Sequence, residues 1–374
     1  MKVIHIMDNL ATAGGVNSVV FDLCESMTNQ GIEVLLIGIL KKKESEEINA
    51  LKKLGVCVKC LNSPNKKHAV THDIPLLRRE IKKFVGEEVT ICNLHLKLSV
   101  LMGSLAAMGL KNVKCVETYH NMYHHYTLQY TVLYPLIKHY IAISNTCGEE
   151  MKRRFHTPTK KMTVIPNGID SKKIRSFVDT NVKEDKNDSI FMLSVGRLSH
   201  EKNFIIPIEA FVNICCDKIS YSLIGDGPEY TELKNISEKN KYVNLKGACS
   251  RQKCLEEINK ADIIVMPSLW EGRSILQMEA MAFNKPLMLS DVPALREVFL
   301  EEKLSDSELF RVCKWGYLVQ TSNVESYIEA ARHFMEHKEL KNDMVQYVHQ
   351  ISKKNEMDIM VKSYIRVYKK LLSE

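Results

Sequence analysis

The chain has 374 residues, enough for two domains, and its composition (45% hydrophobic, 26% charged) is typical of a soluble globular enzyme. The longest apolar run, Leu98–Leu110, is too short to span a bilayer, which argues against an integral membrane protein, and we expect no secretory signal. The net charge is +7, and eleven scattered cysteines, an odd number, indicate reduced thiols in a cytoplasm.

The first 170 residues alternate between short apolar runs, typical of buried strands, and segments with the 3.6-residue periodicity of helices. The strands are expected at Val3–Met7, Val34–Leu40, Val56–Leu61, Val89–Leu94, Val113–Glu117 and Tyr140–Ile143. The helices are expected at Val16–Asn29, Glu44–Leu54, Ile74–Val85, Leu98–Leu110, Leu128–Lys138 and Asn145–Phe155. This alternation predicts a parallel, doubly wound sheet.

A polar stretch, 171–188, reads as a linker, and a second alternation follows it. The strands are expected at Ile190–Gly196, Tyr221–Ile224, Val243–Lys246, Ile263–Met266, Pro286–Leu289 and Tyr317–Val319, with a variable loop before Cys313. The helices are expected at Phe204–Cys216, Glu229–Asn240, Arg251–Asn259, Ser274–Phe283, Ala294–Leu300, Val324–His337 and Leu340–Ser352. We therefore predict an α/β fold of two doubly wound Rossmann-like domains, 1–170 and 189–354, facing across a cleft, with a final helix in 355–374.

The stretch Ser268–Ala282 follows one of the buried strands and contains the most informative carboxylate. A helix that begins near Ser274 has a wide apolar arc, and Glu279 falls inside this arc. An unpaired carboxylate on a buried face is unfavourable, so Glu279 needs a partner. Because no basic residue occurs between Ser274 and Asn284, that partner is elsewhere in the fold or is a pair of ligand hydroxyls.

Glu271 lies in the turn before this helix, eight positions ahead of Glu279. The backbone N–H groups around Gly272–Ile275 are at a helix N-terminus, which favours an anion such as a diphosphate. Two carboxylates would then flank an anion cradle. The alternative is a strand–turn–helix unit with one buried salt bridge.

Other chemically suggestive residues also follow expected strands. Arg197 and Lys202 suit a diphosphate, although they could be ordinary surface charges. Gly14 and Gly15 open a helix and allow backbone N–H groups to approach a phosphate, but the spacing of a nicotinamide fingerprint is missing. His120 lies in a loop and could touch a ligand, or it could be structural or exposed.

The sequence gives little indication of a metal site. Cys57, Cys60, His68 and His72 follow a zinc-finger order, but the interval between the pairs is too short. No Asp-x-Asp occurs in the chain, so a diphosphate leaving group would be neutralised by Arg, Lys and helix ends, without metal. We interpret Gly225–Gly227 as a tight turn.

The positive charge is concentrated in the first half of the chain. Residues 1–165 contain 22 Lys and Arg against 14 Asp and Glu, whereas the remainder contains 30 against 31. This asymmetry suggests an anionic partner, and a membrane surface is one candidate. Nucleic acid is not expected, because no basic stretch is interleaved with aromatic residues. A merely solvated basic face is the alternative.

Taken together, these loops resemble those of family 4 of the retaining glycosyltransferases, which have the GT-B fold. The resemblance covers most of the chain, and Glu271-x7-Glu279 is its most specific part. The other matching segments are Gly14–Val16, Glu117–Asn121, Ile143–Ser144, Val164–Asp170, Val195–Lys202, Ile224–Pro228 and Leu245–Gly247. The final helix also resembles the one that crosses back onto the first domain in this family.

The resemblance implies roles for the second-domain residues. Glu279 would bind the nucleotide ribose, and Glu271 would lie near hydroxyls of the donor sugar. Arg197 and Lys202 would hold the diphosphate and stabilise it as it leaves. The donor-binding N–H groups would come from Gly272, Arg273, Ser274 and Ile275.

Further roles follow from the same resemblance. Gly14 and Gly15 would approach the diphosphate from the first domain, and His120 matches the active-site histidine that contacts the donor sugar. Cys249 would lie where backbone contacts to the base fall. The turn commonly reads Glu-Gly-Phe-Gly in this family, and here Arg273 replaces the aromatic residue. We hypothesise that Arg273 makes an extra contact to the diphosphate or to an anionic donor or acceptor.

The sequence thus predicts a retaining hexosyltransferase that needs neither cofactor nor metal and uses a UDP- or GDP-sugar. The expected acceptor is a saccharide or a lipid-linked saccharide at the inner face of the membrane, as in bacterial capsule or exopolysaccharide assembly. We therefore expect a cytoplasmic protein, either free or bound peripherally to the inner face of that membrane. The alternatives are a GT-B nucleotide-sugar epimerase or hydrolase, and a nucleotide-sugar-binding protein without turnover.

Overall fold

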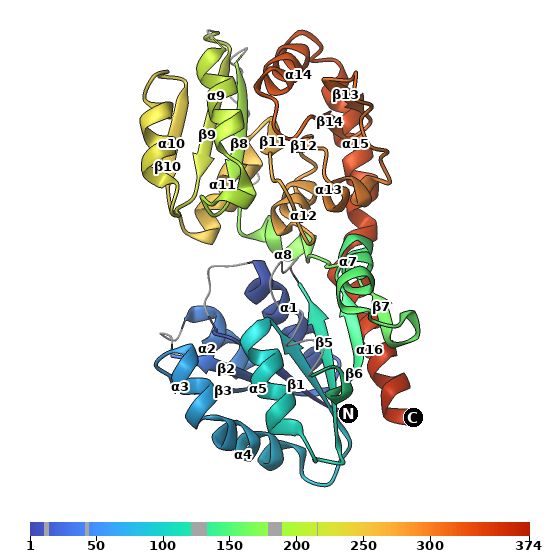
Figure 1. The fold of residues 1–374 in the computed structure, drawn as a ribbon. Helices are drawn as coiled ribbons and strands as arrows, with labels where there is room; N and C mark the ends of the chain where they lie inside the picture. The colour runs from blue at the N-terminus through green and yellow to red at the C-terminus, as the bar shows by residue number, and fades with distance from the viewer. Residues whose placement is uncertain (11–14, 42–44, 121–132, 179–188, 215) are drawn as a thin grey trace. The chain divides into compact units, whose positions relative to one another are not determined.

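The computed structural model describes residues 1–10, 15–41, 45–120, 133–178, 189–214 and 216–374. The chain forms two compact units (Figure 1). Unit 1 consists of Met1–Gly168 together with Met357–Glu374, and unit 2 consists of Ile169–Glu356. Each unit is built on a seven-stranded sheet flanked by helices, which confirms the predicted class of two doubly wound α/β units.

Unit 1 contains a parallel sheet, and inner strands such as Lys2–Met7 and Thr90–His95 are almost completely buried, as expected when helices cover both faces. The strand order is β3 (Cys57–Ser63), β2 (Glu33–Leu40), β1 (Lys2–Met7), β4 (Thr90–His95), β5 (Val113–Tyr119), β6 (Ile137–Ala142) and β7 (Met162–Val164). Its helices include α1 (Gly15–Asn29), α2 (Glu46–Lys53), α3 (Lys66–His72), α4 (Ile74–Val85), α5 (Lys97–Ala107) and α7 (Asn145–Phe155).

The C-terminal helix α16 (Met357–Ser373) belongs to unit 1, although the whole of unit 2 separates it in sequence from the rest of that unit. Figure 1 shows it in red beside the green and cyan strands of this unit. The Tyr368 hydroxyl accepts from Asn93 Nδ2 in β4 (2.7 Å), and Lys114 Nζ in β5 donates to the Leu371 carbonyl (2.6 Å). These bonds join the helix to two inner strands of the sheet, and Tyr364, Tyr368 and Leu371 of the helix are buried.

Unit 2 has a second sheet that is parallel except for one antiparallel strand at its edge. The strand order is β10 (Val243–Gly247), β9 (Ile219–Ile224), β8 (Ile190–Val195), β11 (Ile263–Met266), β12 (Leu287–Ser290), β14 (Gly316–Val319) and β13 (Phe310–Cys313). The helices are α8 (Ser171–Ser176), α9 (Ile205–Asn213), α10 (Tyr230–Ser237), α11 (Arg251–Lys260), α12 (Ile275–Ala282), α13 (Pro293–Arg296), α14 (Val324–Glu336) and α15 (Leu340–Ser352) within the described residues.

The predicted linker 171–188 is wrong in its first part. Ser171–Ser176 forms the short helix α8, whose N-cap is the Asp170 side chain accepting from Lys173 N (2.8 Å). Ile174 and Val178 are buried in the core of unit 2. Their four-residue spacing gives the segment one apolar face. The prediction of a linker was based on composition, which is dominated by the charged neighbours and does not reveal this face. Residues 179–188 lie outside the described part of the chain.

Four other elements differ from the sequence-based expectation. The helix expected over Leu128–Lys138 is wrong at its end, because Ile137 and Lys138 are in β6; most of the remainder lies outside the described residues. Helix α3 and the strands β7 and β13 were not expected. Strands β7 and β13 are edge strands of three and four residues, too short for a clear periodicity.

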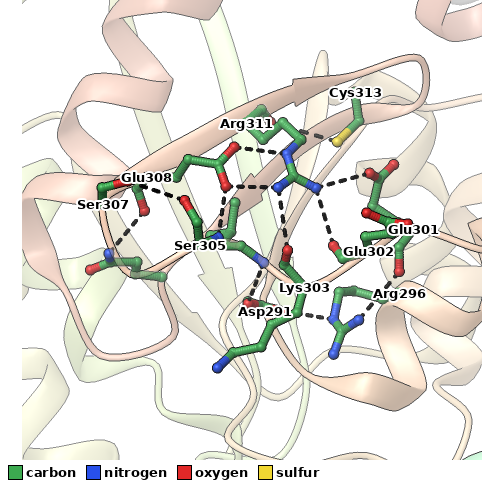
Figure 2. Close-up of polar contacts among 12 residues, drawn as sticks. Asp291, Arg296, Glu301, Glu302, Lys303, Ser305, Ser307, Glu308, Arg311 and Cys313 are labelled. Carbon is green, nitrogen blue, oxygen red and sulfur yellow. Dashed lines mark hydrogen bonds and ion pairs between the residues drawn. The ribbon is translucent and has the colours of Figure 1, made fainter.

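The loop expected before Cys313 is held together by a cluster of charged side chains (Figure 2). Arg311 binds Glu308 through two bonds, Nε to Oε1 (2.9 Å) and Nη2 to Oε2 (2.7 Å), and Nη1 also reaches Glu301 Oε1 (3.3 Å). Arg296 pairs with Asp291 just after β12 (2.5 Å). One guanidinium therefore neutralises part of an acidic run and fixes a loop without regular secondary structure.

Candidate functional site

In unit 2, the loop after β8 carries Arg197 and packs tightly against the loop after β9. Leu198 N donates to the Asp226 carbonyl (3.0 Å), and a Cβ added to Gly225 would lie 1.8 Å from the Gly196 carbonyl oxygen. Only glycine at position 225 permits this approach. The predicted tight turn at Gly225–Gly227 therefore has a specific purpose, because it supports the backbone beside the exposed Arg197 side chain.

Asn203 joins three loops of unit 2 and was missed by the sequence reasoning. Its backbone is left-handed (φ 53°), and its side-chain amide donates to the carbonyls of Pro267 (3.2 Å) and Thr321 (2.9 Å). These carbonyls follow β11 and β14, so one buried side chain ties together the ends of separate strands. The sequence could have indicated this role, because Asn203 lies in a loop directly after a strand and Asn tolerates the left-handed backbone conformation.

Two predicted site residues, Lys202 and Glu271, contact each other directly. Lys202 Nζ lies 2.5 Å from Glu271 Oε1, and Ser268 Oγ donates to the same oxygen (2.8 Å). The Lys202 side chain is 26% exposed and that of Glu271 is 10% exposed, so the pair is reachable from solvent. A second tie is the bond from Leu269 N to the Glu201 carbonyl (2.9 Å).

The turn after Glu271 leads into α12 at Ile275. Gly272, Arg273 and Ser274 are buried, and Ser274 occupies the N-cap position without a side-chain capping bond. The α12 N-terminus therefore follows the Lys202–Glu271 pair directly in the chain. Its first-turn N–H groups belong to the set that a helix cannot satisfy internally.

Glu279 has a partner from another helix. Arg251, the first residue of α11, lies with Nη2 3.4 Å from Glu279 Oε1; the Glu279 side chain is 14% exposed and that of Arg251 38%. The sequence argument that Glu279 needs a partner from elsewhere in the fold is therefore satisfied, although the carboxylate is less buried than expected. Cys249, near the start of α11, is exposed.

Arg273 is the departure from the family pattern, and its side chain is only 8% exposed. Its guanidinium donates to the Asn355 side-chain oxygen, and the Asn355 carbonyl in turn accepts from Ile169 N (2.9 Å). Burial lowers the pKa of Arg273 to about 10, with Glu297 acting in the opposite direction. Arg273 thus links the turn before α12 to residues at both ends of unit 2, and its contact to an anionic ligand stays a prediction.

In unit 1, the predicted site residues are Gly14, Gly15 and His120. Gly14 lies outside the described residues, and Gly15 is the exposed first residue of α1. His120 directly follows β5 and is buried, with Nε2 lying 2.9 Å from Nδ1 of His95. The sequence reasoning singled out neither His95 nor His5, which lies 2.9 Å from His95 on its other side.

Within the described residues, no group of three or more His, Cys, Asp or Glu side chains is placed to hold a metal ion. His68 and His72 of the zinc-like set stack on each other in α3, with ring centroids 4.6 Å apart. The same part of the chain also has no helix with the length and apolarity required to span a membrane.

Comparison with known families places these observations in context. A model of group 1 glycosyl transferases matches residues 177–351, and a model of glycosyltransferase family 4 matches residues 13–173. The two matches cover both units, and the chain belongs to the family 4 glycosyltransferases. The predicted resemblance is thereby confirmed.

Several curated relatives match part of the chain. The GPI3 subunit of phosphatidylinositol N-acetylglucosaminyltransferase from Saccharomyces cerevisiae is 27% identical over 190 residues, 49% of this chain and 41% of the subunit. UDP-Gal:alpha-D-GlcNAc-diphosphoundecaprenol alpha-1,3-galactosyltransferase from Escherichia coli is 24% identical over 269 residues, 65% of this chain and 66% of the enzyme. The matches therefore span less than two thirds of either relative.

Solved structures share the fold over nearly the whole chain. HepE from Anabaena in complex with UDP-glucose superposes with a TM-score of 0.79 at 14% identity, covering 99% of this chain and all of the other. A glycosyltransferase from Rickettsia africae gives a TM-score of 0.78 at 16% identity, covering 99% and 98%. The fold is accordingly that of the GT-B glycosyltransferases, as predicted.

Proposed function

We propose that this chain is a retaining, metal-independent hexosyltransferase that uses a UDP- or GDP-sugar. The observation that carries the proposal is the Lys202–Glu271 pair, which immediately precedes the N-terminus of α12. The Lys202 cation and the helix N-terminus can both bind a diphosphate, and the Glu271 carboxylate can accept hydrogen bonds from sugar hydroxyls. Arg197 and Glu279 complete the donor-binding set.

The chemistry follows from this arrangement. When the donor enters, the diphosphate competes with Glu271 for Lys202, and the released carboxylate can accept hydrogen bonds from the sugar. The bond between the anomeric carbon and the phosphate oxygen breaks, and Lys202, Arg197 and the helix end stabilise the leaving diphosphate. The acceptor hydroxyl attacks from the face that the phosphate leaves, and its proton passes to the departing phosphate oxygen. We assign no protein nucleophile.

The acceptor class is inferred from the relatives. The Escherichia coli relative is named for a diphosphoundecaprenol-linked acceptor, and so is a Campylobacter jejuni relative that is 25% identical over 219 residues. We propose a lipid-linked saccharide acceptor, as in bacterial surface-polysaccharide assembly. Helix α4 of unit 1 supports a contact with anionic lipid, because Arg79, Lys82 and Lys83 are exposed on it while Leu77 and Ile81 are buried.

Product formation tests the proposal directly. The purified chain is incubated with UDP- and GDP-hexoses and undecaprenyl-diphosphate-linked saccharides, with EDTA present. We expect nucleoside diphosphate release that requires the acceptor, and an α-linked product when the donor is α-linked. Release of the diphosphate with a changed or free sugar and no acceptor would instead identify an epimerase or hydrolase.

A variant of the predicted ribose-binding carboxylate tests the donor site. Glu279→Ala should lose the rise in melting temperature that UDP or GDP gives to the unaltered protein. The matched control is Glu238→Ala, because Glu238 is an exposed carboxylate at the end of α10. Donor binding without any product, for every acceptor class tried, would favour a binding protein.

A further inference from the structure

Three histidines follow one another across neighbouring strands of unit 1: His5 in β1, His95 at the end of β4 and His120 just after β5. His5 Nδ1 lies 2.9 Å from His95 Nε2, and His95 Nδ1 lies 2.9 Å from His120 Nε2. The register explains the alignment. His5 pairs with Asn93 and His95 pairs with Thr118, and each next histidine is two residues further along, on the same face.

The chain of rings is buried and uncharged. His5 and His95 are fully buried, and His120 is 3% exposed. Burial lowers the pKa of His5 and of His120 to about 3 and, together with the other two rings, lowers that of His95. All three rings are therefore neutral near pH 7, and a neutral imidazole has one N–H and one lone pair.

Two hydrogen bonds between three neutral rings leave only two proton arrangements. If His5 donates from Nδ1, then His95 and His120 must also carry their protons on Nδ1. If His120 donates from Nε2, then all three rings carry their protons on Nε2. The three tautomers are thus coupled, and the tautomer of His5, at the other end of the row of rings, decides which nitrogen of His120 is protonated.

The surroundings of His5 and His120, the two end rings, favour one of the two proton arrangements. Within the described residues, His5 Nε2 and His120 Nδ1 are buried without hydrogen-bond partners. A buried acceptor without a partner is tolerated better than a buried N–H without one. Either arrangement leaves one such N–H, on His5 Nε2 or on His120 Nδ1. His5 lies within β1 and is fully buried, whereas His120 follows the end of β5 and is 3% exposed, so the N–H is better placed on His120 Nδ1, where a ligand could accept from it.

We propose that His95 and His5 are positioning residues that hold His120 in the Nδ1–H tautomer, so that His120 offers a ligand a fixed hydrogen-bond donor. This inference rests on the proposed function and on the contact between His120 and the donor sugar that the family resemblance implies. It goes further by stating what His120 does there: the ring donates one hydrogen bond and does not act as a base toward the acceptor hydroxyl.

The backbone around His95 supports a dedicated position. Leu96 has φ 74°, a conformation that side-chain-bearing residues rarely adopt. Ser99 Oγ donates to the His95 carbonyl, and Asp8 Oδ1 accepts from Ser99 N at the start of α5 (2.9 Å). Ser99 therefore anchors the backbone of the turn that directly follows His95.

Nitrogen NMR of the full chain, with ¹⁵N-labelled histidine, tests the proposal without substrate. The chemical shifts of the two ring nitrogens report which one is protonated, and His→Gln variants assign the signals. We expect all three rings to be Nδ1–H at pH 7. A His120 ring protonated on Nε2, or three rings with unlike tautomers, would overturn the proposal.

Variants test the consequence for catalysis. His95→Phe keeps an aromatic ring but breaks both bonds; we expect mixed tautomers at His120 and about a tenfold lower kcat with little change in KM. His139→Gln is the matched control, because His139 in β6 bonds Thr163 (2.9 Å) outside the chain of three rings. If His95→Phe leaves both the His120 tautomer and kcat unchanged, the positioning role is excluded.

The two proposals fail in different ways. An Nδ1–H tautomer at all three rings with no glycosyl transfer would overturn the proposed function alone. Transfer by a protein whose His120 is protonated on Nε2 would overturn the positioning role alone. The NMR measurement on the unaltered chain remains decisive even if His95→Phe does not fold.

Discussion

The two units hold their polar side chains in contrasting ways. In unit 1, three neutral histidines and the Asn93–Tyr368 pair are buried and are linked by hydrogen bonds between neutral groups. In unit 2, charged pairs such as Lys202–Glu271 stay partly exposed. Desolvation is least unfavourable for a neutral group and most unfavourable for a charge. Unit 1 should therefore respond to protons, and unit 2 should respond to the removal of single charges and to salt.

The largest expected effect is a loss of stability in acid that originates in unit 1. The pKa values of His5 and His120 are about 3 in the folded protein and near 6.5 when unfolded, so the unfolded chain binds more protons between these values. Stability should be complete above pH 6.5 and fall below it, by about 2 kcal/mol per histidine at pH 5. Urea denaturation from pH 7.5 to pH 5 measures this loss.

A variant identifies the origin of the acid sensitivity. Asp8, near the same strand ends, has a pKa raised mainly by burial, which acts in the opposite direction. His5→Phe removes one titrating ring and keeps Asp8, so its stability should fall less steeply with decreasing pH. Equal slopes for the two proteins would show that His5 is not responsible.

The next effect is expected in unit 2, where Lys202→Ala removes the cation that pairs with Glu271. We expect kcat/KM to fall about a hundredfold, because a group that stabilises leaving-group charge is lost. Stability should change by only about 1 kcal/mol, since the pair is partly exposed. Steady-state kinetics and thermal unfolding measure the two quantities, with Lys234→Ala in α10 as the control. A variant with full activity would refute the leaving-group role.

The sequence predicted much of unit 2 because its signals are local. The strand β11, the helix α12 and the basic residues after β8 lie in short segments, and the periodicity of each segment is clear. The sequence could not show which residue pairs with Glu279, because Arg251 is 28 positions away and its approach depends on how α11 packs on α12. The need for a partner was predictable, but its identity was not.

Unit 1 illustrates the opposite limit. His5 lies inside an apolar strand and His95 at the end of another, so each reads as an isolated core residue. Their relation to His120 depends on the order β1–β4–β5 and on the register of two strand pairs. Neither can be derived from the spacing along the chain, whereas both follow at once when the sheet is known.

Arg273 lies between these two extremes, since it is a buried cation within unit 2. Arg273→Ala leaves the Asn355 side chain without this donor and creates space behind the turn, so we expect a loss of about 2 kcal/mol in stability. If the bond only supports the turn, Arg273→Gln should recover stability and activity together. Recovery of stability with a persistent rise in donor KM would support the predicted contact with the diphosphate.

The smallest effect is expected for Arg251, whose bond to Glu279 is long (3.4 Å) and whose side chain is 38% exposed. Arg251→Ala should cost about 0.5 kcal/mol at low salt and nothing measurable at 0.5 M NaCl, because exposed pairs are weak and screened. Donor affinity should stay the same or rise, since Glu279 becomes available to the ribose. Titration of the nucleotide at two salt concentrations distinguishes these effects. A loss of affinity as large as that of Glu279→Ala would mean that Arg251 itself binds the nucleotide. Arg251 could then no longer be regarded only as the residue that pairs with Glu279 before the nucleotide binds.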